Sequence, residues 1–173
     1  MKKDIYESIK AYFDEKEMEY IFSEEGHLFA LKIKLIFDTV DFIAEVDEKQ
    51  GLIQLFSVLP VKCGEANRLI AESFLETLNS EAPAIYGAFR FSDMGEALGD
   101  VFYHLAFLYD KENFSSEMFD KYITHCLMMT DMNYLNIKRI FSGDLKPDEA
   151  AEYRAKIEKA LAGLGSAGKE TLS

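Results

Sequence analysis

Apolar and polar residues alternate along this chain with two periods, one typical of helices and one typical of strands. In the first segment, apolar side chains recur every three to four residues among charged ones, which predicts an amphipathic helix over residues 3–17. Every second residue is apolar over residues 29–37 and 40–46, and this period of two predicts strands. A turn at residues 23–26 predicts a short strand before it, over 19–22, and a turn at 48–51 predicts a hairpin with a strand over 52–59.

The second half returns to helical spacing and then repeats the strand pattern. A helix is predicted over residues 64–79, followed by strands over 84–91 and 97–108. The apolar side of that helix is formed by Ala66, Leu69, Ile70, Phe74 and Leu78.

Phe114 and Ser115 are typical of a hydrophobic staple and an N-cap, so a long helix is predicted to begin there and to end at Gly143. An interruption of this helix near Thr130 and Asp131 is left open. A further helix is predicted from Pro147.

This order of elements, α-β-β-β-α-β-β-α-α, predicts an α+β fold in which an antiparallel sheet of about five strands has helices packed on it. A chain of 173 residues is long enough to bury one core. We expect a single domain over residues 1–145, an additional C-terminal helix over 146–163 and a flexible tail over 164–173.

The net charge of -12 restricts which partners the protein can bind, because an acidic surface repels phosphate backbones and anionic lipids. We therefore expect neither nucleic acid nor a membrane as partner, and a basic or apolar protein segment fits better. The two cysteines, Cys63 and Cys126, form no C-x-x-C pair, and no apolar run is long enough to span a bilayer. These features predict a cytoplasmic protein.

Candidate chemistry in the sequence is weak. The segment 163–169 has the Gly and Lys spacing of a phosphate-binding loop, but it follows a predicted helix instead of a strand. His125 and Cys126 are neighbours on a helix and point about 100° apart. We therefore predict no catalytic residue, no cofactor and no metal site, and a protein that is not an enzyme.

One enzymatic alternative remains, in which folding assembles an acid or base. Its candidate residues are Asp93, Asp100, His104 and Asp131.

Strand 52–59 is apolar on both faces, which is more than one core face requires. Its second face must be covered by a helix of the chain, by a second subunit or by a bound peptide. We assign the candidate partner-binding residues to this face: Ile43, Leu52, Phe56 and Val58.

Three features accompany this order of elements: Leu78 and Asn79 close one helix, a strand covers residues 86–91, and a helix starts over 114–119. With these features the chain resembles the YbjN-like family of bacterial sensory-transduction regulators. The resemblance covers residues 5 to about 143. That family shares its fold with the type III secretion chaperones. The resemblance implies a small, often dimeric, non-enzymatic module that covers apolar segments of a partner protein in a chaperone-like or regulatory role, with a purely structural homodimer as the alternative.

Overall fold

The structure is a computed structural model that describes residues 4–81, 87–91, 100–110, 114–144, 148, 149 and 152. Predicted residues 84–86 and 97–99 of two strands, most of the last helix and the tail lie outside this part of the chain. The elements are α1 (Ile5–Glu15), β1 (Tyr20–Ser23), β2 (Leu28–Lys34), β3 (Thr39–Asp47), β4 (Leu52–Leu59), a 3-10 turn (Glu65–Asn67), α2 (Arg68–Glu81), β5 (Ala88–Phe91), β6 (Val101–Leu108) and α3 (Ser116–Phe141).

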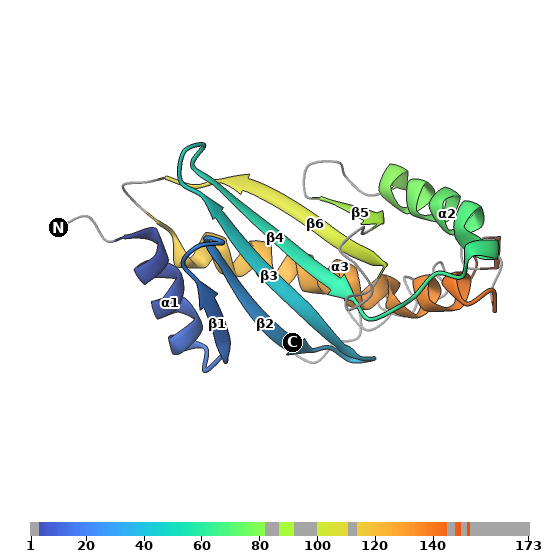
Figure 1. Ribbon diagram of the computed structural model, residues 1–173, viewed down its shortest axis with the longest axis horizontal. Helices are drawn as coiled ribbons and strands as arrows, with labels where there is room; N and C mark the ends of the chain where they lie inside the picture. Colours follow the sequence, from blue (N-terminus) through green and yellow to red (C-terminus); the bar gives the residue numbers. More distant parts are fainter. Residues whose placement is uncertain are drawn as a thin grey trace, which may run out of the picture.

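The strands form one antiparallel sheet in the order β1-β2-β3-β4-β6-β5 (Figure 1). The predicted α+β class with an antiparallel sheet is confirmed, but the sheet has six strands and not about five. The short strand predicted over residues 19–22 was not counted among those five; it is present as Tyr20–Ser23 and pairs with β2 along its whole length. A short edge strand is stabilised by this pairing and not by its own length.

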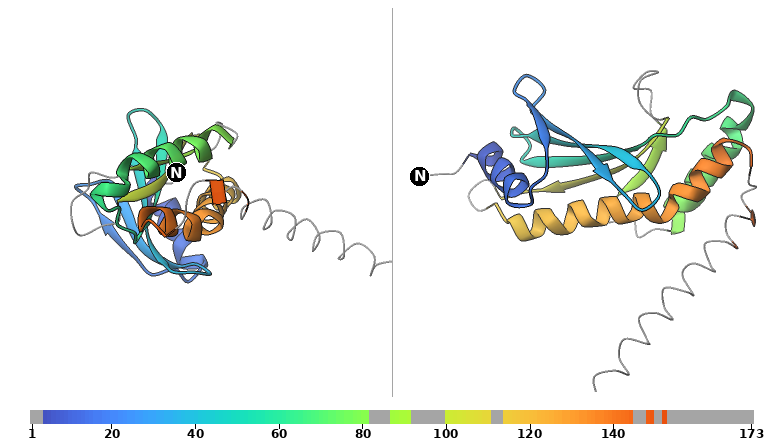
Figure 2. Two further views of the ribbon diagram at one scale, coloured as in Figure 1. Left: turned by 90° about the vertical axis from the view of Figure 1, so that its right-hand side faces the viewer. Right: turned by 90° about the horizontal axis from the view of Figure 1, so that it is seen from below.

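Helix α3 packs along one face of the sheet, against β4 and β6, and α1 lies beside its first half (Figure 2). Helix α2 lies at the far end of the molecule, against β5 and the last part of α3. The opposite face of the sheet carries none of the described helices. None of these helices is long and apolar enough to cross a membrane.

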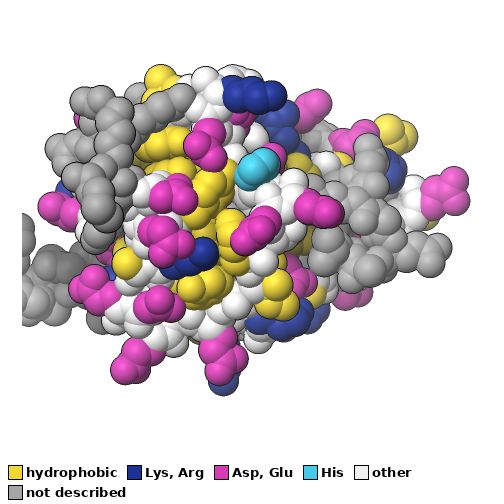
Figure 3. Space-filling view, turned by 60° about the vertical axis from the view of Figure 1, so that its left-hand side comes forward, with side chains coloured by type: hydrophobic (Ala, Val, Ile, Leu, Met, Phe, Trp, Pro, Cys, Tyr) yellow, Lys and Arg dark blue, Asp and Glu magenta, His cyan; other side chains and the backbone are white. Residues whose placement is uncertain are grey.

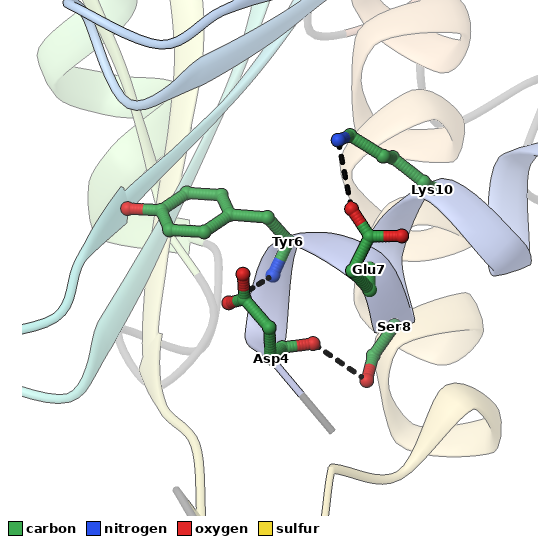
Figure 4. A network of polar contacts seen from close by, with 5 residues as sticks. All are labelled: Asp4, Tyr6, Glu7, Ser8 and Lys10. Atoms are coloured by element: carbon green, nitrogen blue, oxygen red, sulfur yellow. Dashed lines mark hydrogen bonds and ion pairs between the residues drawn. The ribbon is translucent and has the colours of Figure 1, made fainter. Parts of the chain in front are cut away.

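Helix α1 begins with a polar cap (Figure 4). The Asp4 carboxylate accepts a hydrogen bond from the backbone N–H of Tyr6 at 3.2 Å, and the Ser8 hydroxyl donates to the Asp4 carbonyl at 3.1 Å. Lys10 pairs with Glu7 one turn along. The Tyr6 side chain points away from these groups toward the strands. Its ring packs 5.5 Å from that of Phe22, and its hydroxyl oxygen lies 2.9 Å from His27 Nδ1.

An aromatic cluster around Phe13 joins α1 to the sheet and to α3. The Phe13 ring is fully buried, and its centroid lies 5.6 Å from those of Tyr20 and Phe29 and 6.0 Å from that of Phe119. Four elements therefore meet at one side chain.

The predicted apolar side of α2 is confirmed at Phe74 and Leu78, which are buried, and wrong at Leu69 and Ile70, which are 81% and 47% exposed. Ala71 and Leu75 are buried in their place. The side of α2 that packs against β5 and α3 therefore runs through Ala71, and Ile70 and Leu69 lie about 100° and 200° around the helix from it.

Helix α3 runs without interruption from Ser116 to Phe141, and the break considered near Thr130 is absent. The Thr130 hydroxyl donates to the Cys126 carbonyl at 2.9 Å, which keeps this buried polar group inside the helix. The predicted ends are confirmed: the Ser115 side chain accepts from the Met118 N–H, and Gly143 follows with φ of 82°.

Gly87 approaches β6 so closely that its missing side chain is a requirement of the fold. A Cβ at this position would lie 2.4 Å from the carbonyl oxygen of His104, and φ is +140°. We expect Gly87→Ala to lower the free energy of unfolding by about 2 kcal/mol or more. Urea denaturation followed by circular dichroism measures the change.

The matched control is Gly64→Ala. Gly64 has φ of -63°, and the nearest atom to an added Cβ, Asn67 Nδ2, is 3.7 Å away. This substitution should change the free energy of unfolding by less than about 1 kcal/mol. Equal losses in the two variants would contradict the close approach at Gly87.

Candidate protein-binding surface

The face of the sheet opposite α3 carries a line of apolar side chains that crosses four strands. Pairing places Ile21 opposite Ala30, Ala30 opposite Ile43, and Ile43 opposite Phe56. Because side chains opposite each other in paired strands share a face, all four lie on one side. We call Ile21, Ala30, Ile43 and Phe56 the apolar row.

The structure brings three of the four predicted partner-binding residues into reach of solvent. Ile43 and Phe56 lie in the apolar row, and Leu52 lies on the same face at the start of β4; all three are half-buried. Val58 is on this face too, but it is only 1% exposed. As a result, Val58 is not available to a partner in this conformation.

Two residues of this face were missed by the sequence reasoning. Ile21 is 74% exposed, and Leu108, which pairs with Leu52, is 72% exposed. The alternation of β6 contains the signal for Leu108, since Phe107 points into the core. For Ile21 the signal is weaker, because a strand of four residues shows little periodicity.

Phe56 is held in place by His104 of β6. The two rings stack at a centroid distance of 4.7 Å and an angle of 13°. His104 Nε2 lies 3.1 Å from Gln54 Oε1, so the neutral imidazole donates its N–H to that amide oxygen. Burial lowers the pKa of His104 below its ordinary value of 6.5, and the charge of Arg90 lowers it further. At neutral pH, therefore, the stack is uncharged.

The lowered pKa of His104 predicts a pH dependence of stability. The unfolded chain binds the proton more readily, so the free energy of unfolding falls as pH decreases below about 6.5. Urea denaturation between pH 7 and pH 5 should show a shallower fall in His104→Phe than in the wild type. His125, whose pKa burial also lowers, is present in both proteins and serves as the common background. Identical slopes would contradict the assignment.

A hollow of about 400 Å³ adjoins the apolar row at the β1 edge and is lined in part by Ile21, Ala30, Lys32 and Asp41. Lys32 and Asp41 form an ion pair of 2.7 Å there. Figure 3 views the molecule from the side on which α1 lies and shows hydrophobic side chains there with Asp and Glu side chains around and between them.

The residues of the enzymatic alternative do not form one site among the described positions. The Asp100 carboxylate accepts from the Cys63 N–H at 2.7 Å and pairs with Lys62. His104 belongs to the stack on the open face, and Asp131 accepts from the Ile36 N–H on the α3 side of the sheet. Asp93 lies outside the described residues.

Comparison with known proteins bears on the fold. No protein-family model matches the sequence, and no curated protein matches it either. Among solved structures, a chain of the ExsC–ExsE complex superposes with a TM-score of 0.56 at 13% identity, covering 76% of this chain and 94% of that chain. A chain of the HopA1–SchA chaperone–effector complex gives a TM-score of 0.46 at 11% identity, over 71% of this chain and 87% of that chain.

At 13% identity the likeness to the ExsC–ExsE complex establishes a shared fold and nothing about function. The prediction of an α+β, type III secretion chaperone-like fold is confirmed in this sense.

Proposed function

We propose that this protein is a non-enzymatic protein-binding module, chaperone-like or regulatory, that covers an apolar segment of a partner protein. One observation carries the proposal: the apolar row crosses the face of the sheet on which no described helix lies. Burying such side chains on a partner stabilises the complex by about 1.5–3 kcal/mol for each large residue.

The charge of the molecule selects the kind of segment. With a net charge of -12 and with Glu45 two residues along β3 from Ile43, on the same face, the surface attracts basic residues. A segment that alternates apolar and basic residues fits both properties. In extended form it would present its apolar side chains to the row and its cations to the acids.

The ExsC–ExsE structure supports this mode of action by analogy of fold. Membership of the YbjN-like family belongs to the same proposal. A cytoplasmic location is also part of it, since Cys63 and Cys126 are both free thiols and suit a reducing compartment.

A purely structural homodimer is the second candidate, because exposed Ile21 and Leu108 could equally contact another copy of the chain. In that case the apolar row would be covered in solution without any partner.

Fluorescence anisotropy with three labelled nonapeptides tests the proposal. We expect a peptide of alternating Leu and Lys to bind at least about tenfold more tightly than peptides of alternating Leu and Glu or Ser and Lys. If the Ser–Lys peptide bound as tightly as the Leu–Lys peptide, charge attraction alone would account for the binding. A dimer by light scattering that binds none of the peptides would favour the structural homodimer.

A further inference from the structure

A second apolar surface lies on the other side of the molecule, on α3 and the adjacent turn between β2 and β3. Met128 and Met132 are 46% and 36% exposed, and Ile36 and Phe37 of the turn are 81% and 48% exposed. We call these four residues the methionine stripe. It is separated from the apolar row by the sheet and its core.

Polar contacts hold the turn against α3, so they fix the position of Ile36 and Phe37 relative to the two methionines. The Ile36 N–H donates to Asp131 at 3.1 Å, and the Tyr134 hydroxyl donates to Asp38. A shallow hollow of about 640 Å³ lies between the two elements, lined among others by Leu35, Ile36, Leu127 and Met128.

The chain that follows α3 is the right length to cover this hollow. Six residues separate Phe141 from Asp148, which is helical together with Glu149 and Glu152. Connections of this length commonly join antiparallel helices. A helix over residues 147–163 would be about 25 Å long, while Met128 lies about 20 Å back along α3 from its end.

The sequence of this segment also matches the stripe. Ala150, Tyr153, Ile157 and Leu161 are spaced by three or four residues, which places them on one side of a helix. In an antiparallel arrangement Ile157 comes opposite Met132, and Leu161 comes opposite Met128. Lys156, which precedes Ile157, is opposite in charge to Asp131 beside Met132.

We propose that the C-terminal segment, residues 147–163, packs as an antiparallel helix on the methionine stripe of its own chain. Methionine side chains adapt to the shape of an apolar partner, which suits such a docking surface. This inference is independent of the proposed function, because it concerns the opposite side of the sheet.

Disulfide cross-linking in the full-length chain tests the packing. The test protein carries Met132→Cys and Ile157→Cys, and the control carries Met132→Cys and Lys159→Cys, because Lys159 lies about 200° around the helix from Ile157. Both also carry Cys63→Ser. Cys126 stays, since its thiol is fully buried and burial raises its pKa.

After mild oxidation, non-reducing gels should show a compact, intramolecularly cross-linked monomer for the 132–157 pair. The 132–159 pair should give no such cross-linked monomer. A disulfide-linked dimer of the 132–157 protein would instead show that a second copy covers the stripe. Absence of any cross-link, or equal cross-linking of both pairs in protein folded by circular dichroism, would overturn the inference.

Discussion

Replacing Phe56 by aspartate should weaken binding of the alternating Leu–Lys peptide by roughly 10- to 150-fold. Phe56 is the largest side chain of the apolar row, and it is supported by its stack on His104 and by an edge contact to Phe102 at 5.7 Å. The substitution removes its apolar contact area and requires a carboxylate to be buried on binding. Anisotropy titration of wild type and variant measures the difference.

Leu69→Asp is the matched control for this experiment. Leu69 is 81% exposed on α2 and lies outside the apolar row, but the same charge is introduced. We expect its affinity for the peptide to stay close to that of the wild type. Similar loss in both variants would mean that net charge alone governs binding. Unfolding of Phe56→Asp would show that Phe56 belongs to the core, and Phe56→Ser would then report whether a smaller change still affects binding.

Phe13→Ala should be the most destabilising of the substitutions considered, with a loss of about 3–5 kcal/mol in the free energy of unfolding. The ring packs between α1, β1, β2 and α3, so its removal leaves a cavity lined by Tyr20, Phe29 and Phe119. Domains of this size are stabilised by about 5–15 kcal/mol in total, so the variant should unfold at much lower urea concentration.

Leu69→Ala serves as the control for stability and should change the free energy of unfolding by less than about 0.5 kcal/mol. A loss at Phe13 no larger than that at Leu69 would contradict the central position of the aromatic cluster. Urea denaturation monitored by circular dichroism is sufficient for both variants.

Local periodicity was enough to predict most elements of this fold. Strand β3 and the ends of α3 follow directly from alternating or capping residues, because these patterns depend on neighbours within a few positions. The buried side of α2 was predicted only in part, because it depends on β5 and α3, which pack against this helix and lie far from its first turn in the sequence.

The candidate surface was predicted in part. The excess of apolar residues on β4 pointed to Leu52 and Phe56, and the neighbouring strand added Ile43. The contribution of Ile21 depends on β1 pairing at the edge of the sheet, and Val58 is buried at a position where it pairs with Phe102 of β6, distant in sequence. Neither could be read from alternation, because alternation gives the face of a residue and not what covers that face.

For this protein the sequence alone determined the types of the elements, the acidity of the surface and the surplus of apolar side chains on β4. Tertiary structure decided that β6 lies between β4 and β5, and so placed His104 against Phe56 although 48 positions separate them in the chain. The order of strands depends on which apolar faces can be buried together over the whole domain. A local sequence pattern therefore does not predict it.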